Sequence, residues 1–115
     1  MLVKSNGRPM RIMKSVKGGI GEVMLHDITT PETLPKNMRV LTYVTLKTGE
    51  SVGKHIHDDE SELYHCIDGE GTVVIDGRKF NINQGDTVIT SSGQEHSIKN
   101  TGLSDLVVLA VVVHD

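Results

Sequence analysis

Alanine is almost absent from this sequence, since Ala110 is the single alanine among 115 residues, against fourteen valines and nine isoleucines. β-branched residues lose side-chain freedom in helices and pack well on pleated sheets. Aromatic residues are also scarce, with no tryptophan and only Tyr43, Tyr64 and Phe80. The composition therefore largely excludes helix and predicts an all-β chain with an aliphatic core.

Cysteines and clusters of basic residues are scarce as well. The one cysteine, Cys66, cannot form an internal disulfide, which fits a reducing cytoplasm. No run of lysines and arginines occurs and the formal net charge is -3, which argues against nucleic acid or an anionic membrane as a partner. No apolar run reaches membrane-spanning length, and the N-terminal MLVKSNGRPM contains no secretory apolar region. We expect a cytoplasmic protein with one domain, residues 1–115.

Short apolar segments separated by turn residues run along the chain. The Asp76-Gly77 pair predicts a two-residue hairpin turn. Residues 106–113 are almost continuously apolar and are expected to form a strand buried on both faces. Many short strands with glycine-rich turns indicate a sandwich or a barrel. The other predicted strands are 11–17 (at a sheet edge), 22–28, 39–47, 62–68, 72–75, 78–83, 86–90 and 95–100.

Two irregular segments were weighed as functional loops. The glycine-rich residues 18–21 suggest a phosphate-binding loop, but no helical pattern follows them and the third glycine of a dinucleotide motif is missing. We interpret them as a turn before the next strand. Residues 29–37 contain two prolines and form the longest irregular stretch. We interpret this stretch as an ordinary connector rather than a lid or a subunit contact.

The segment from Gly49 to Gly69 carries candidate metal ligands. His55 and His57 are two residues apart, so a strand directs both imidazoles to one face. Glu62 lies five residues after His57, an odd number, and would face the other side of an unbroken strand. The polar residues 58–61 must therefore bulge or turn, and such irregularities re-aim side chains next to active sites. Two neutral imidazoles and one carboxylate that converge form a first-row transition-metal site.

A second segment, residues 85–100, supplies a third histidine, His96, after a Ser-Ser-Gly turn. Together the two segments resemble the paired motifs of the cupin superfamily, motif 1 at 49–69 and motif 2 at 85–100. The positions that match are Gly49, His55, His57, Glu62 and Gly69 in motif 1, and Gly85, Gly93, His96 and Asn100 in motif 2. Ser91 stands where the family usually has proline, which removes no ligand. The resemblance implies a double-stranded β-helix, a jelly-roll β-barrel with a metal inside.

The resemblance also implies which side chains would bind that metal. The implied ligands are His55, His57, Glu62 and His96. Glu60 is one residue short of the spacing that the motif requires, so Glu62 is the better ligand. The remaining histidines, at positions 26, 65 and 114, have no such spacing, and alternation from Glu62 directs His65 away from the site.

This donor set suits one divalent transition metal ion, Mn, Fe, Co, Ni, Cu or Zn, and does not choose among them. If the ion is six-coordinate, two positions stay open, as at catalytic and ligand-binding sites rather than at closed structural ones. A small oxygenated metabolite would then bind in a bidentate manner. Because ligand imidazoles must be neutral, we predict metal loss well below a pH of about 6.

Fold and metal together leave the activity open. Alternation from Glu62 places Tyr64 and Cys66 on the inward face, where Tyr64 is either a catalytic hydrogen-bond donor or a core aromatic, and Cys66 is expected to be a small buried hydrophobe. No second carboxylate is clearly directed inward, which favours dioxygenase- or decarboxylase-like chemistry or simple binding. The alternatives are a non-catalytic cupin that binds a sugar or another small molecule, and a sugar isomerase or epimerase. The resemblance also implies a homodimer.

Overall fold

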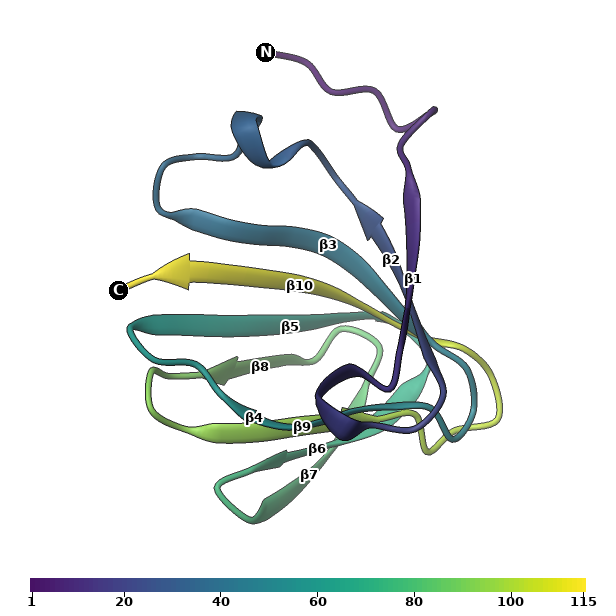
Figure 1. The fold of residues 1–115 in the computed structure, drawn as a ribbon. Helices are drawn as coiled ribbons and strands as arrows, with labels where there is room; N and C mark the ends of the chain where they lie inside the picture. Colours follow the sequence, from purple (N-terminus) through teal and green to yellow (C-terminus); the bar gives the residue numbers. More distant parts are fainter.

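The computed structural model describes all residues from Met1 to Asp115. It consists of strands and two short 3-10 turns, which confirms the all-β prediction (Figure 1). No helix in it is long and apolar enough to cross a membrane. In chain order the elements are β1 (Met10–Lys14), η1 (Val16–Gly18), β2 (Glu22–Asp27), η2 (Pro31–Thr33), β3 (Met38–Leu46), β4 (Ser51–Ile56), β5 (Glu60–Asp68), β6 (Glu70–Ile75), β7 (Arg78–Asn83), β8 (Thr87–Thr90), β9 (Glu95–Lys99) and β10 (Leu106–His114).

The strands form two antiparallel sheets that face each other (Figure 1). The six-stranded sheet has the order β1-β2-β3-β10-β5-β8, and the four-stranded sheet has the order β4-β9-β6-β7. Successive strands repeatedly change sheet, as β4 and β5 do, and β8 and β9. This winding between two sheets is the double-stranded β-helix that the sequence predicted.

The core lies between the inner faces of the sheets. Twelve buried hydrophobic residues form it, and Tyr64 is the only aromatic residue among them. Leu46, Val73 and Leu106 are completely buried. Burying one such aliphatic side chain contributes about 1.5–3 kcal/mol. The prediction of an aliphatic core is confirmed.

Two strand predictions need correction. β10 is buried on only one face, since Val107 and Val111 on its other face are half-buried. The expectation of burial on both faces is wrong because that outer face of the six-stranded sheet has no further layer over it. The first strand lies at the sheet edge as expected but ends at Lys14, since Ser15 and Lys17 adopt positive φ angles of 50° and 54°.

The hairpin between β6 and β7 is as predicted. Asp76 and Gly77 form its two-residue turn, with φ angles of 48° and 79°. Positive φ at both positions matches the twist of the flanking strands, and this is the reason for the Asp-Gly preference. Residues 29–37 form the connection between β2 and β3, with η2 as their only regular turn.

Candidate metal centre

The turn between β4 and β5 brings the motif 1 side chains together. His55 is on β4, His57 follows the end of that strand, and Glu62 is on β5 in the opposite sheet. Asp59 reverses the chain with a positive φ of 59°. The predicted turn within residues 58–61 is therefore confirmed, except that β5 already begins at Glu60. The change of sheet directs Glu62 inward, toward the histidines.

The motif 2 turn is bonded to the motif 1 turn. The Gly93 amide donates to the His57 carbonyl at 2.9 Å, and the Asp59 amide donates to Ser92 Oγ at 2.9 Å. The Ser91 amide donates to Gln94 Oε1 at 2.8 Å, a bond that the family's usual proline could not make. The hydrogen bond from the Ser91 amide to Gln94 thus constrains this turn, as the proline ring does in other members of the family.

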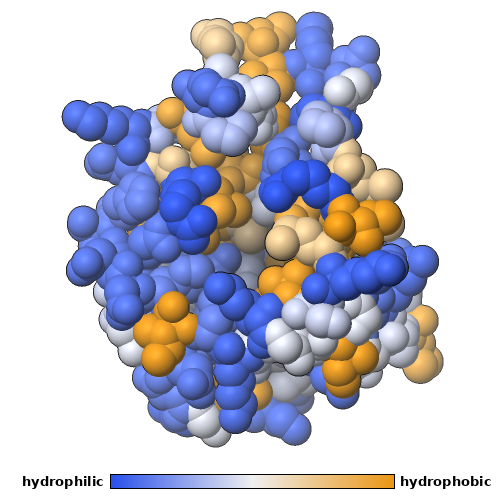
Figure 2. Space-filling view, viewed as in Figure 1, coloured by the Kyte–Doolittle hydropathy of each residue, from blue (hydrophilic) through white to orange (hydrophobic).

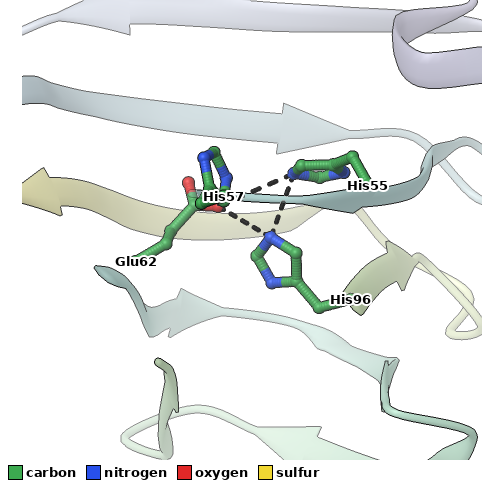
Figure 3. A group of neighbouring side chains, drawn as sticks. All are labelled: His55, His57, Glu62 and His96. Carbon is green, nitrogen blue, oxygen red and sulfur yellow. Dashed lines mark hydrogen bonds and ion pairs between the residues drawn. The ribbon is translucent and has the colours of Figure 1, made fainter. Parts of the chain in front are cut away.

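Four side chains converge on one point between the sheets (Figure 3). His96, on β9, lies directly across from His55 in the strand pairing. Glu62 Oε1 lies 2.9 Å from His96 Nε2, 3.0 Å from His57 Nε2 and 3.8 Å from His55 Nε2. The Nε2 atoms of His55 and His96 are 3.0 Å apart. One ligand atom from each residue lies within 4.8 Å of the others, so the group can hold a metal ion.

The other ring nitrogens fix which atoms face this centre. His55 Nδ1 lies 2.8 Å from the Gly53 carbonyl oxygen, and His57 Nδ1 lies 3.3 Å from Glu60 Oε1. Both partners only accept hydrogen bonds, so each Nδ1 donates to its partner, and in the neutral form of each ring Nε2 would present a lone pair to the centre. Lone pairs and a carboxylate oxygen at these distances repel unless a cation lies between them. The donor set therefore fits a transition metal ion.

The charges of the cluster are strongly coupled. Burial alone would raise the pKa of the Glu62 carboxyl. Hydrogen bonds from His55 and His96 and the nearby imidazole charges outweigh burial and bring this pKa down to about 2. Burial alone lowers the pKa of His55, yet its contacts with Glu62 and the Gly53 carbonyl raise it overall. Protons on the imidazoles thus substitute for a metal cation around Glu62, and the two compete for the same nitrogen lone pairs.

A cavity of about 250 Å³ leads to the cluster. Its walls are mostly apolar, with Val23, Val44 and Val112 among them, and Glu62 is the only carboxylate that lines it. The lining also includes three basic side chains, Arg11, Lys17 and Arg39. Figure 2 shows a hollow in the middle of the molecule with hydrophobic side chains on its walls and hydrophilic ones around it, the same combination that lines this cavity. The cavity suits a small ligand that carries polar or charged groups at one end.

The structure places the other candidate residues as alternation predicted. Tyr64 is 5% exposed, stacks on the His96 ring with 5.5 Å between ring centres, and lines the cavity. Burial and the nearby Glu62 carboxylate raise the pKa of Tyr64 well above its ordinary value, so its hydroxyl keeps its proton. Cys66 is 1% exposed, and burial raises the pKa of its thiol, as expected for an inert core residue. His65 lies off the inward register and contacts Thr87.

Sequence reasoning missed three supporting residues. Glu60 was considered only as a rival ligand, but it contacts His57 Nδ1 and pairs with Arg39. Thr90 Oγ1 lies 3.0 Å from His96 Nδ1, and both residues are buried. Asn100, the last residue of motif 2, is completely buried and donates to the carbonyls of Leu46 and Ser104, both at 2.8 Å. Glu60 and Thr90 are three and six residues from the histidines that they contact, across a turn in each case, whereas Asn100 and Leu46 are 54 residues apart. Alternation along a strand records none of these contacts.

The fold and the histidine cluster define a double-stranded β-helix whose interior site can hold a metal ion, and comparison with known proteins agrees on the family. A model of the cupin domain family matches residues 42–112, which include every residue of the cluster, so the chain belongs to the cupin family. An oxalate-binding protein of Thermotoga maritima is 36% identical over 113 residues, which cover 98% of this chain and 93% of that protein.

Two solved structures are also similar to this chain. The crystal structure of a Thermotoga maritima protein described as a predicted oxalate decarboxylase has a TM-score of 0.94 and 36% identity, with 100% of both chains covered. KdgF from a Halomonas species has a TM-score of 0.80, with 100% of this chain and 94% of that chain covered. Its 13% identity makes it a likeness of fold alone.

Proposed function

We propose that this protein binds one divalent transition metal ion through His55, His57, Glu62 and His96, and binds a small dicarboxylate of the oxalate type beside it. The observation that carries this proposal is the convergence of three imidazole Nε2 atoms on Glu62 Oε1. When bound, the ion supplies a Lewis acid that accepts oxygen ligands. The oxalate-binding relative supports the choice of ligand.

The cavity supports the ligand class on its own. A volume of about 250 Å³ accommodates a ligand with few heavy atoms and no large sugar chain. Basic side chains line it while Glu62 is the only acidic one, so with a divalent ion bound the site carries a net positive charge and favours an anion. The buried Tyr64 hydroxyl remains protonated and can donate a hydrogen bond to a ligand oxygen.

The residues of the cavity favour ligand binding without catalysis. An isomerase or epimerase needs a general base beside the ligand, and no carboxylate other than the candidate ligand Glu62 lines the cavity. Decarboxylation is the second candidate, favoured by the likeness to a protein described as a predicted oxalate decarboxylase. In that reaction the C–C bond of oxalate breaks, CO2 leaves, and the remaining carbon takes a proton to give formate. Tyr64 is the candidate donor of that proton. Dioxygenase-like chemistry is the remaining candidate, and iron or copper in the purified protein would favour it.

The test begins with elemental analysis of protein purified without added metal or chelator. We expect one transition metal ion per chain in the native protein and none in the His96→Ala variant. His65→Ala is the matched control, because this histidine lies outside the cluster. Calorimetric titration with oxalate should then show binding to the metal-loaded protein and no binding after the metal is removed. Absence of metal in the native protein after reconstitution contradicts the metal site, whereas metal binding without oxalate binding contradicts only the ligand. Release of formate and CO2 would favour the second candidate.

A further inference from the structure

The three basic side chains that line the cavity differ in how their charges are compensated. Arg11 makes two hydrogen bonds of 2.8 Å to the carboxylate of Asp27, and Arg39 pairs with Glu60. Lys17 makes no ion pair and no side-chain hydrogen bond. Lys17 is therefore the only basic residue of the cavity lining whose charge no carboxylate compensates, and its exposed side chain has hydrogen-bond donors that are free for a ligand.

The packing of the preceding residue and an unusual backbone conformation fix the main chain at Lys17. Val16 packs against the core, and Lys17 itself has a left-handed backbone with φ 54° and ψ 33°. A residue other than glycine rarely adopts this conformation, and such residues concentrate at functional sites. The bend that this conformation makes carries the chain from the end of β1 across β4 (Figure 1).

Close contact between two glycines joins this bend to the strand that carries His55. A Cβ added to Gly53 would lie 2.1 Å from the Lys17 carbonyl oxygen, and one added to Gly19 would lie 2.2 Å from the Ser51 carbonyl oxygen. Glycine is required at both positions because any side chain would collide with backbone. Lys17 and His55 are therefore parts of one rigid unit at the cavity.

The total charge of the site with a divalent ion bound indicates the role of Lys17. Three neutral imidazoles, the Glu62 carboxylate and a divalent cation together carry one positive charge. Lys17 raises this to two, which matches a dianion and exceeds what a monoanion can neutralise.

We propose that Lys17 binds a carboxylate of the ligand and makes the site selective for dianionic over monoanionic ligands. This inference rests on the proposed function, because it needs a metal ion at the histidine cluster and a dicarboxylate beside it. The Gly19–Gly53 contact fixes the backbone from which the Lys17 side chain extends. Lys17 is thus a specificity-determining residue that lies outside both cupin motifs.

The test is a calorimetric titration of Co²⁺-loaded protein with oxalate and with glycolate, a monoanion of similar size. We expect Lys17→Met to weaken oxalate binding by about tenfold or more, as loss of a charge-assisted hydrogen bond predicts, and glycolate binding by much less. Lys17→Arg should restore most of the oxalate affinity because it keeps the charge. Oxalate affinity should also fall less steeply with salt in Lys17→Met than in the native protein.

Lys54→Met is the matched control, since it removes the same charge from β4 while the exposed side chain of Lys54 does not line the cavity. It should bind both ligands as the native protein does. Equal Co²⁺ affinity and equal melting temperatures would show that the Lys17 variants keep the fold and the metal site. Unchanged oxalate affinity in Lys17→Met, or equal losses for oxalate and glycolate, would overturn the inference and leave the proposed function intact. Failure of the native loaded protein to bind oxalate would overturn both.

Discussion

The carboxylate of Glu60 lies 3.3 Å from Nδ1 of His57 and thereby directs Nε2 of that imidazole toward Glu62. Glu60 also pairs with Arg39, and this contact is the main reason why the pKa of Glu60 is lowered. A carboxylate that holds the outer nitrogen of a ligand histidine fixes its tautomer and orientation. Glu60 is therefore placed to position the His57 ring and lies outside the four-residue cluster.

Removing this support should weaken metal binding. We expect Glu60→Ala to lower the affinity for Co²⁺ by about 10- to 100-fold, the usual cost of losing such an outer contact. Glu60→Gln should retain most of the affinity because its amide oxygen still accepts from Nδ1. Competition titration with a metal indicator measures both variants. Asp58→Asn, which changes an exposed carboxylate in the same turn, serves as the control, and equal affinity in Glu60→Ala and Asp58→Asn would refute the role.

The folding stability of the metal-free protein and its affinity for metal should depend on pH in different ways. The pKa of Glu62 is lowered to about 2, so its contribution to folding stability is present above its ordinary value of 4.5 and is lost as pH falls toward about 2. The pKa of His55 is raised from 6.5, so its contribution is present below 6.5 and is lost as pH rises through the raised value.

The melting temperature of the metal-free protein should therefore be highest between roughly pH 4.5 and 6.5. Metal affinity should instead rise with pH over this range, since protons leave the ligand imidazoles. Thermal scans across this range, with and without Co²⁺, measure both trends. A metal-free protein whose stability rises steadily from pH 5 to 8 would argue against the coupling between Glu62 and His55.

Tyr64 lines the cavity, and replacing it tests the catalytic role predicted for it. Tyr64→Phe removes one hydroxyl donor and keeps the ring that stacks on His96. We expect oxalate affinity to fall by about 3- to 15-fold, as for one lost hydrogen bond, with Co²⁺ affinity unchanged. If the protein releases formate, a larger fall in kcat than in affinity would identify Tyr64 as the proton donor. Unchanged binding and turnover would leave Tyr64 as a core aromatic only.

Asn100 should contribute to stability rather than to ligand binding. Its side chain donates to two main-chain carbonyls and accepts from the Gly102 amide at 2.9 Å, and two of these three bonds are buried. Asn100→Ala leaves these groups without partners, and we expect a loss of about 2–4 kcal/mol in the free energy of unfolding. Urea denaturation measures it. Asn83→Ala, at an exposed side chain on β7, is the control and should cost far less.

The homodimer implied by the cupin resemblance remains a prediction, and β1 is its candidate contact. Every residue of this edge strand is exposed, including Met10 at 48% and Ile12 at 51%. A paired second copy would bury this apolar edge. Sedimentation analysis should show a native dimer that Ile12→Lys weakens, while Ile56→Lys, at a similarly exposed position in the other sheet, leaves it intact. A monomeric native protein would contradict the prediction.

The sequence alone determined the strand content, the Asp76-Gly77 hairpin and the four converging side chains. β-branched composition and period-2 alternation act locally, so they can be read without coordinates. The odd spacing between His57 and Glu62 required a turn, and a turn lies there. The cupin motifs then related two segments that are distant in the chain.

Only the tertiary structure decided the surroundings of these ligands. Glu60 and Thr90 contact His57 and His96 across the turns that join each pair, and Lys17 lines the cavity because Gly19 meets the backbone of β4. The half-exposed outer face of β10 likewise depends on which elements cover the sheet, and nothing within residues 106–113 encodes this. Local sequence determines which way a side chain points along its strand, whereas its partners depend on how distant segments pack together.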